Sequence, residues 1–220
     1  MIVTIDGPAG AGKSTVAKLL AKRLGYQYLD TGAMYRAIAW ALNDMQLELD
    51  DFTAVQRALG EIQLSMNAGR ILVNQKDVTD QLREPAVSQN ASRVATHGAV
   101  REKLVELQRI IAGQGRYVCE GRDQGTVVFP DALCKIFLTA DPVVRAKRRW
   151  LEMQGNDPAI TLDAVVADQK DRDHRDETRE IGRLVKADDA VEVDVSELDI
   201  EQVVDKIECL VRNRNEDAGA

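Results

Sequence analysis

The clearest chemical motif in this chain is a glycine-rich segment near its start, Gly7-Pro8-Ala9-Gly10-Ala11-Gly12-Lys13-Ser14-Thr15. It contains the full phosphate-loop pattern G-x-x-x-x-G-K-[ST]. Glycines let successive backbone N–H groups turn toward an anion, and the start of a following helix adds partial positive charge. Lys13 can reach the outer phosphates of a nucleotide, and Ser14 can ligate Mg²⁺. Residues 7–15 therefore predict that the chain binds a nucleoside triphosphate.

A second polar cluster, Asp30-Thr31-Gly32-Ala33-Met34-Tyr35-Arg36, lies where a strand expected at 28–29 meets a helix expected at 33–42. Thr31 is expected to cap that helix, in which case the Asp-Thr-Gly run is structural. Arg36 would then be a surface charge one turn into the helix. The residues alone leave this structural interpretation and a ligand-binding one open.

A third cluster, Glu120-Gly121-Arg122-Asp123-Gln124-Gly125-Thr126, follows the apolar run at 117–119. Open α/β sheets bind ligands at the carboxyl ends of their strands, which makes Arg122 and Asp123 candidates for ligand contact. The alternative is a turn that contains a salt bridge.

Arginines gather on two expected helices, one at 141–155 and one from 161 towards 179. On the first, Arg145, Arg148 and Arg149 share a face. The stripe expected on the second helix and just beyond it consists of Arg172, Arg175, Asp176, Arg179 and Arg183. The acidic residues Asp171, Asp173 and Glu177 are expected to point elsewhere. A solvated, charge-laced surface is the alternative, but phosphoryl transfer needs cations of this kind to spread the charge of the moving phosphate.

The composition of the chain limits the classes of molecule that it is expected to bind. The chain has 220 residues, 45% of them hydrophobic, and a net charge of −7, which suits one compact domain with small insertions. The acidic balance argues against a nucleic-acid or anionic-membrane partner. Cys119, Cys134 and Cys209 form no C-x-x-C pair, and no secretory leader precedes the first strand, so we expect a cytoplasmic protein with reduced thiols. No exposed apolar stripe is evident, and a monomer is expected.

The elements that position these residues predict an α/β fold with a mainly parallel sheet flanked by helices. The expected core strands lie at 2–6, 28–29, 117–120, 135–138 and 190–193. After the phosphate loop, apolar residues recur at helical spacing, and Gly25 is placed to end that helix.

One stretch departs from this alternation of strands and helices. Residues 61–79 alternate as a small inserted antiparallel hairpin or meander. One helical stretch is expected from about 87 to 112. The run Asn74-Gln75-Lys76-Asp77 differs in order from the guanine-reading N-K-x-D element and is interpreted as a solvated turn.

Together these segments resemble the bacterial cytidylate kinases, which are P-loop nucleoside monophosphate kinases. The likeness runs from residue 2 to about 211 and rests mainly on residues 7–15, 30–36, 121–130, 135–138 and 170–179. The resemblance implies a P-loop-type sheet in a single cytidylate kinase domain. Its core would span about 1–30, 114–147 and 180–220, its monophosphate-binding region about 31–113, and its short mobile lid about 148–170.

The resemblance also implies roles for individual residues. Lys13, Arg122 and Arg148 correspond to residues that act on the transferred phosphate. The positions expected to bind the acceptor nucleotide are Thr31, Arg36, Ser92, Arg101, Arg122, Asp123, Arg172, Asp176 and Arg179. Among them, Ser92, Arg101 and Asp123 correspond to cytosine contacts, and Arg172 and Asp176 to ribose contacts. Glu120 and Thr31 stand where the family often has Asp and Ser, which keeps the functional group and changes its reach or bulk.

The function implied is direct in-line transfer of the ATP γ-phosphoryl group to CMP, and also dCMP, with Mg²⁺. The chemistry agrees, because an Asp carboxylate can accept a hydrogen bond from the cytosine 4-amino group, where uracil presents a carbonyl. Two alternatives remain at this point. One is a kinase for UMP or a non-nucleotide metabolite, and the other is a P-loop switch that signals by its nucleotide state.

Overall fold

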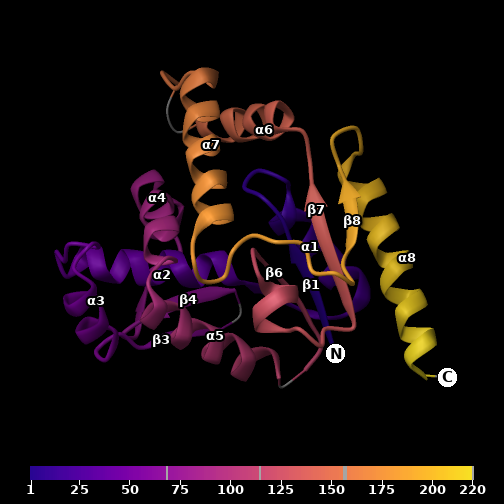
Figure 1. Cartoon of the computed structure of the whole chain (residues 1–220), viewed down its shortest axis with the longest axis horizontal. Coiled ribbons are helices and arrows are strands. Elements are labelled where there is room, and N and C mark those ends of the chain that lie inside the picture. Colours follow the sequence, from indigo (N-terminus) through magenta and orange to yellow (C-terminus); the bar gives the residue numbers. More distant parts are fainter. Residues whose placement is uncertain (68, 114, 156–157, 220) are drawn as a thin grey trace. The chain divides into compact units, whose positions relative to one another are not determined.

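The computed structural model describes residues 1–67, 69–113, 115–155 and 158–219. The chain forms two compact units, which are Met1–Leu29 with Ala112–Ala220, and Asp30–Ile111 (Figure 1). Residue 114 of the predicted core and residues 156–157 of the predicted lid lie outside the described residues.

The first unit is built on a five-stranded sheet in the order β2-β6-β1-β7-β8. Its strands are β1 (Ile2–Asp6), β2 (Gln27–Asp30), β6 (Tyr117–Gly121), β7 (Cys134–Thr139) and β8 (Val191–Asp194). β1 pairs in parallel with β6 and β7, and β7 pairs in parallel with β8. Asp6 lies opposite Gly121 in this register. The carboxyl ends of β1 and β6, and the polar segments that follow them, therefore lie at the same edge of the sheet.

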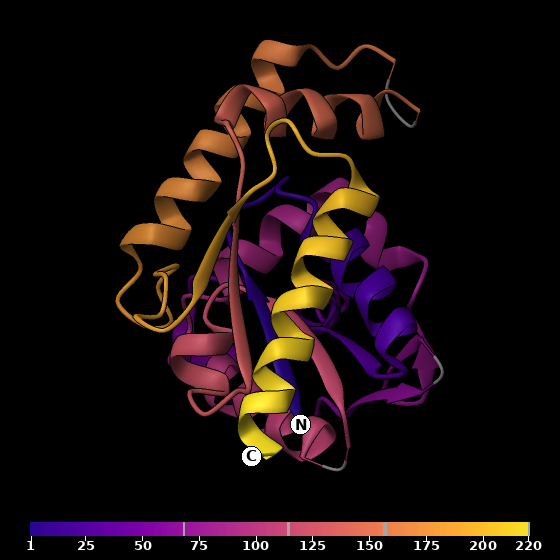
Figure 2. The same ribbon diagram turned by 90° about the vertical axis from the view of Figure 1, so that its right-hand side faces the viewer.

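Among the described residues of this unit, four helices and one short turn accompany the sheet. They are α1 (Lys13–Leu24), the π-helical turn η2 (Gln124–Val128), α6 (Pro142–Gln154), α7 (Leu162–Thr178) and α8 (Ile200–Gly219). The helices α1 and α8 bury their apolar faces in one cluster with the strands, including Leu20, Ile207 and Ile5. Figure 2 shows α8, in yellow, running alongside the strands of the sheet. α7 packs against α6, and Trp150 of α6 donates from Nε1 to the carbonyl of Ile160, just before α7, at 2.9 Å.

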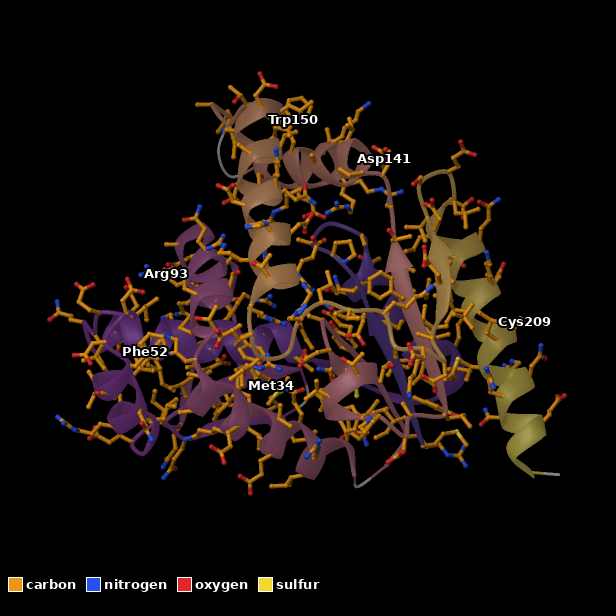
Figure 3. All side chains as sticks on the ribbon, in the orientation of Figure 1. Met34, Phe52, Arg93, Asp141, Trp150 and Cys209 are labelled. Atoms are coloured by element: carbon orange, nitrogen blue, oxygen red, sulfur yellow. The ribbon has the colours of Figure 1, made fainter. Side chains whose placement is uncertain are left out.

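The α6 helix begins as its sequence predicts. The Asp141 side chain caps it by accepting from the Val143 N–H at 2.8 Å, and Pro142 takes the first position, where a missing N–H costs little (Figure 3). α1 ends at Gly25, which has φ of 66°.

The second unit combines helices with a small antiparallel sheet in the order β3-β4-β5. Its elements are α2 (Thr31–Asp44), α3 (Phe52–Leu59), β3 (Leu64–Asn67), β4 (Arg70–Val73), β5 (Lys76–Asp77), η1 (Gln81–Arg83), α4 (Pro85–Val94) and α5 (Gly98–Ala112). The predicted meander is thus confirmed. Asn74 and Gln75 form its second turn, with φ of 48° and 68°.

Two local predictions in this unit were wrong. Asp30, not Thr31, caps α2, because the Asp30 carboxylate reaches the Ala33 N–H at 2.8 Å while Thr31 is already helical. The helix expected over 87–112 is two helices. At the break, the Thr96 N–H and hydroxyl both bind the Arg93 carbonyl, which an uninterrupted helix would offer to the N–H four residues on.

Two of the three cysteines pack in the interior of the first unit. Cys119 and Cys134 are buried, as predicted, whereas Cys209 is exposed on α8 (Figure 3). Burial raises the pKa of the Cys134 thiol to about 11 and that of Cys119 further. Within the described parts of the chain, no helix has both the length and the apolar character that crossing a bilayer demands.

The cluster between α1, α8 and the sheet is expected to carry much of the stability of the first unit. Leu20 is fully buried in it, so Leu20→Ala should lower the free energy of unfolding by about 2–5 kcal/mol in urea titrations. Leu151→Ala is the matched control, because that side chain is 56% exposed, and it should cost less than about 1 kcal/mol. Equal losses in the two variants would contradict this assignment of the core.

Candidate active site

The predicted phosphate loop connects β1 to α1 at the carboxyl edge of the sheet. Its first residue needs to be glycine, because a Cβ on Gly7 would lie 2.0 Å from the Leu138 carbonyl oxygen of the neighbouring strand. Lys13 opens α1 and is buried, with its Nζ donating to the Pro8 carbonyl at 2.7 Å. The lysine therefore lies folded against its own loop.

The Lys13 ammonium lies in a strongly charged environment. Burial lowers the pKa of Lys13, and the positive charges of Arg122 and Arg172 add to the decrease, while Glu120 and Asp176 oppose it. Four other polar residues singled out in the sequence thus lie close enough to Lys13 to act on it electrostatically. An added polyanion would favour the charged form of the lysine.

A hydroxyl and a carboxylate lie together at the start of α1. Ser14 donates from Oγ to Glu120 Oε1 at 2.6 Å, and the Tyr28 hydroxyl donates to the same oxygen at 3.3 Å. Mg²⁺ prefers oxygen ligands and usually keeps several waters beside one or two protein groups. The Ser14–Glu120 pair fits that chemistry. Among the described residues, no group of three or more His, Cys, Asp or Glu side chains is arranged to hold a metal ion.

The segment after β6 is anchored by Asp6, the last residue of β1. The two Asp6 carboxylate oxygens accept from the backbone N–H groups of Gln124 and Gly125, at 2.9 and 2.7 Å. Burial raises the pKa of Asp6 to about 7, although these two hydrogen bonds lower it. Asp123 is 3% exposed, and its backbone carbonyl starts the π-helical turn by accepting from the Val127 and Val128 N–H groups. The backbone that presents Arg122 and Asp123 is therefore fixed from β1.

Asp176 joins α7 to this segment. Arg122 Nε donates to Asp176 Oδ2 at 2.7 Å, and Arg179 lies 3.6 Å from Asp176 Oδ1. Burial alone would raise the pKa of Asp176, but the charges of Arg122, Arg172 and Arg179 lower it below its usual value. Burial likewise opposes the charge on Arg122, and Asp176 raises the pKa of that guanidinium. The structure thus brings Arg122, Asp176 and Arg179 together as one buried ion-pair network.

The three arginines expected to share a face of α6 have different partners. Arg145 is buried and donates to the Ala9 carbonyl at 2.9 Å and to Asp173 at 2.6 Å. Arg148 donates to the Val195 carbonyl at 2.8 Å, and Arg149 pairs with Glu152 at 3.2 Å. Asp173, which was expected to point away from the arginine stripe of α7, neutralises Arg145 of α6.

The remaining predicted acceptor residues belong to the second unit. Thr31 and Arg36 lie in the first turns of α2, where Arg36 pairs with Asp30 at 3.3 Å. Arg101 on α5 is 2% exposed and donates to the Tyr35 hydroxyl at 3.2 Å. Ser92 on α4 is buried, and its hydroxyl has no hydrogen-bond partner among the residues that the structure describes. The buried polar groups Thr31, Ser92 and Arg101 are suited to a polar ligand.

The sequence reasoning did not assign a role to three residues in contact with the loops of the first unit. Asp6 was counted only as the end of a strand, and Gln169 received no role. Asp173 was expected only to point away from the arginine stripe of its helix. A signal for Asp6 was present, since a charged residue ending a buried strand requires a partner. The partner of Gln169 is a backbone carbonyl 160 positions away, which no local pattern reveals.

Comparison with known proteins agrees with this geometry. The family model for cytidylate kinase matches residues 3–213. The cytidylate kinase of Fusobacterium nucleatum subsp. nucleatum is 45% identical over 207 residues, covering 94% of this chain and 95% of that protein. The cytidylate kinase of Desulfitobacterium hafniense is 45% identical over 217 residues, covering 97% and 94%.

A solved structure supports the fold alone. It is an uncharacterized protein from Eubacterium ventriosum, with a TM-score of 0.55 at 15% identity, covering 97% of this chain and 98% of that one. The sequence matches cover nearly the whole chain at 45% identity, and they show that the chain belongs to the cytidylate kinase family of nucleotide kinases.

Proposed function

We propose that this protein transfers the γ-phosphoryl group of ATP to CMP and also to dCMP, giving ADP and CDP or dCDP. The observation that carries the proposal is the buried charge cluster beside the phosphate loop, in which Lys13 lies in the field of Arg122, Arg172, Glu120 and Asp176. Family membership supports a nucleotide as the acceptor. A phosphate-handling site built from fixed cations is what phosphoryl transfer demands, because its transition state spreads negative charge over the transferred oxygens.

In this proposal the chain contributes positioning and charge rather than a covalent step. ATP binds the backbone of residues 7–15, and Lys13 leaves the Pro8 carbonyl for the β- and γ-phosphates. Arg122 and Arg148 bind the moving phosphoryl group. The attacking atom is an oxygen of the acceptor phosphate, whose second pKa is about 6, so near neutral pH it is largely deprotonated without a general base. No phospho-enzyme is formed.

Ser14, with Glu120 as its partner, is proposed to hold Mg²⁺. The ion would neutralise phosphate charge and orient the β- and γ-phosphates. The predicted lid, about 148–170, is proposed to exclude water so that ATP is not hydrolysed.

For the acceptor, we propose that Asp123 accepts a hydrogen bond from the cytosine 4-amino group. Ser92 and Arg101 are proposed as further cytosine contacts, and Thr31 and Arg36 as phosphate contacts. Arg172, Asp176 and Arg179 are proposed to contact the ribose side of the nucleotide, and Asp176 would share its carboxylate between Arg122 and the sugar. A cytoplasmic monomer stays a prediction.

The test of the function is ADP formation with ATP, Mg²⁺ and one acceptor at a time from CMP, dCMP, UMP, AMP, GMP and shikimate. Turnover should depend on the acceptor, be strongest with CMP and dCMP, and stop when the metal is chelated. Strong turnover confined to another acceptor would replace CMP in the proposal. ATP binding with no acceptor-dependent turnover would favour a nucleotide-binding switch.

Lys13→Ala should reduce kcat at least about a hundredfold, because it removes a cation from the transferred phosphate. The fold should survive, because burial already disfavours the charged form of Lys13 and the variant removes this buried charge. Circular dichroism and thermal unfolding check the fold. Lys22→Ala, an exposed position in the same helix, is the matched control and should keep wild-type turnover. A folded Lys13→Ala protein with normal kcat would remove Lys13 from the mechanism.

Asp123→Ala should lower the preference for CMP over UMP by about tenfold or more, since the favourable contact with cytosine and the clash with the uracil carbonyl are both lost. The KM for ATP should stay within about twofold, within the scatter expected of an untouched contact. Asp131→Ala, at an exposed position, controls for loss of charge. If Asp123→Ala keeps the wild-type ratio of kcat/KM for CMP and UMP, another group reads the base.

A further inference from the structure

Two helices of the first unit converge on a single carbonyl of the phosphate loop. The Ala9 oxygen accepts from Arg145 Nη1 of α6 at 2.9 Å and from Gln169 Nε2 of α7 at 2.7 Å. Both side chains are buried, with Gln169 6% exposed and Arg145 6% exposed. Neither residue is among those assigned above to ATP or the acceptor.

The arginine in this arrangement is held from three sides. Its Nε donates to the Ala140 carbonyl at 3.1 Å, and its Nη1 is shared between Ala9 and Asp173 Oδ2, the latter at 2.6 Å. Asp173 lies one turn after Gln169 on α7, so one face of that helix supplies both the neutralising carboxylate and the second donor. We call Arg145, Gln169 and Asp173 the Ala9 latch.

The loop leaves no free space at the latch. A Cβ on Gly10 would lie 2.6 Å from Gln169 Nε2 and 3.1 Å from the Arg145 carbonyl oxygen, and Gly10 has φ of 74°. The glycine is therefore required by the conformation of the loop and also by the close approach of the two helices.

The Ala9 carbonyl and the Gly10 N–H belong to one planar peptide unit, so hydrogen bonds that fix the carbonyl also fix the direction of the N–H. The described residues contain no cis peptide bond, so the Ala9 carbonyl and the Gly10 N–H point in opposite directions across one rigid plane. With the carbonyl fixed toward α6 and α7, the Gly10 N–H points away from them. In a phosphate loop, inward-facing N–H groups are the groups that bind the anion.

We propose that Gln169 and Arg145 are positioning residues that hold the Ala9–Gly10 peptide so that the Gly10 N–H faces the nucleoside triphosphate. This inference rests on the proposed function only in taking the ligand to be ATP. By linkage, ATP that binds the fixed peptide also stabilises the packing of α6 and α7 against the loop. The helices around the predicted lid would thus respond to ATP before any acceptor binds.

The test is ATP binding by isothermal titration calorimetry with Mg²⁺ and without an acceptor. Gln169→Met removes the donor and keeps the length of the side chain, and it should weaken ATP binding by about threefold to tenfold, the range expected for one net hydrogen bond. Gln169→Glu should weaken binding more, because a carboxylate would face the Ala9 carbonyl. Gln56→Met makes the same change at an exposed helical position of the other unit and should bind ATP as the wild type does.

Steady-state kinetics separates positioning from general damage. In Gln169→Met the KM for ATP should rise by a similar factor while the KM for the acceptor stays unchanged; equal rises in both would indicate a structural role and overturn the proposal. Wild-type ATP affinity in Gln169→Met and Gln169→Glu, with both variants folded by circular dichroism, would also overturn it. A wild-type protein that binds ATP but does not phosphorylate CMP would refute the proposed function alone. A wild-type protein that binds no ATP would refute both.

Discussion

The described site of the first unit depends on how β1 ends. Asp6 closes the strand with a buried carboxylate that accepts two backbone N–H groups from the π-helical turn after β6. The next residue, Gly7, passes against the Leu138 carbonyl, where no side chain fits. One strand end therefore starts the phosphate loop and also fixes the segment that carries Arg122 and Asp123. The loop proposed to bind ATP and the segment proposed to bind the acceptor are therefore both held by the end of β1.

Electrostatics explains why these groups are buried together. Lys13, Arg122 and Arg172 share the carboxylates Glu120 and Asp176, and burial lowers the pKa of Lys13 despite them. Burying cations costs free energy unless they are paired. A bound triphosphate, as proposed above, would add negative charge beside Lys13 and favour the charged form of this lysine. A net charge of −7 over the whole chain is compatible with this, because only the local field acts on a buried nucleotide.

The hydrogen bonds that hold the phosphate loop come from elements that are distant from one another in sequence. Lys13 binds the Pro8 carbonyl, and the Ala9 latch binds the following carbonyl from α6 and α7. Two successive carbonyls of the loop thus accept hydrogen bonds from protein donors, and the Gly10 N–H points away from α6 and α7 because the Ala9 carbonyl is held toward them. Arg122 and Asp176 tie the same helix α7 to the end of β6. α7 therefore contacts both segments that the proposed reaction uses.

The sequence by itself determined the phosphate loop, the strand and helix on either side of it, and the parallel α/β class, because these follow from local spacing and the alternation of apolar residues. It also singled out Arg122, Asp176 and Arg179, although not their joining into one network. The break between α4 and α5 was not predicted, since a side chain there competes for a backbone carbonyl within an otherwise helical pattern.

Only the tertiary structure decided that Asp6 holds the turn after β6 and that Asp173 neutralises Arg145. It also decided that Gln169 reaches Ala9. Each of these contacts joins segments whose proximity is set by the packing of strands and helices. The type of a buried polar residue shows that it needs a partner, but it does not show which residue that partner is.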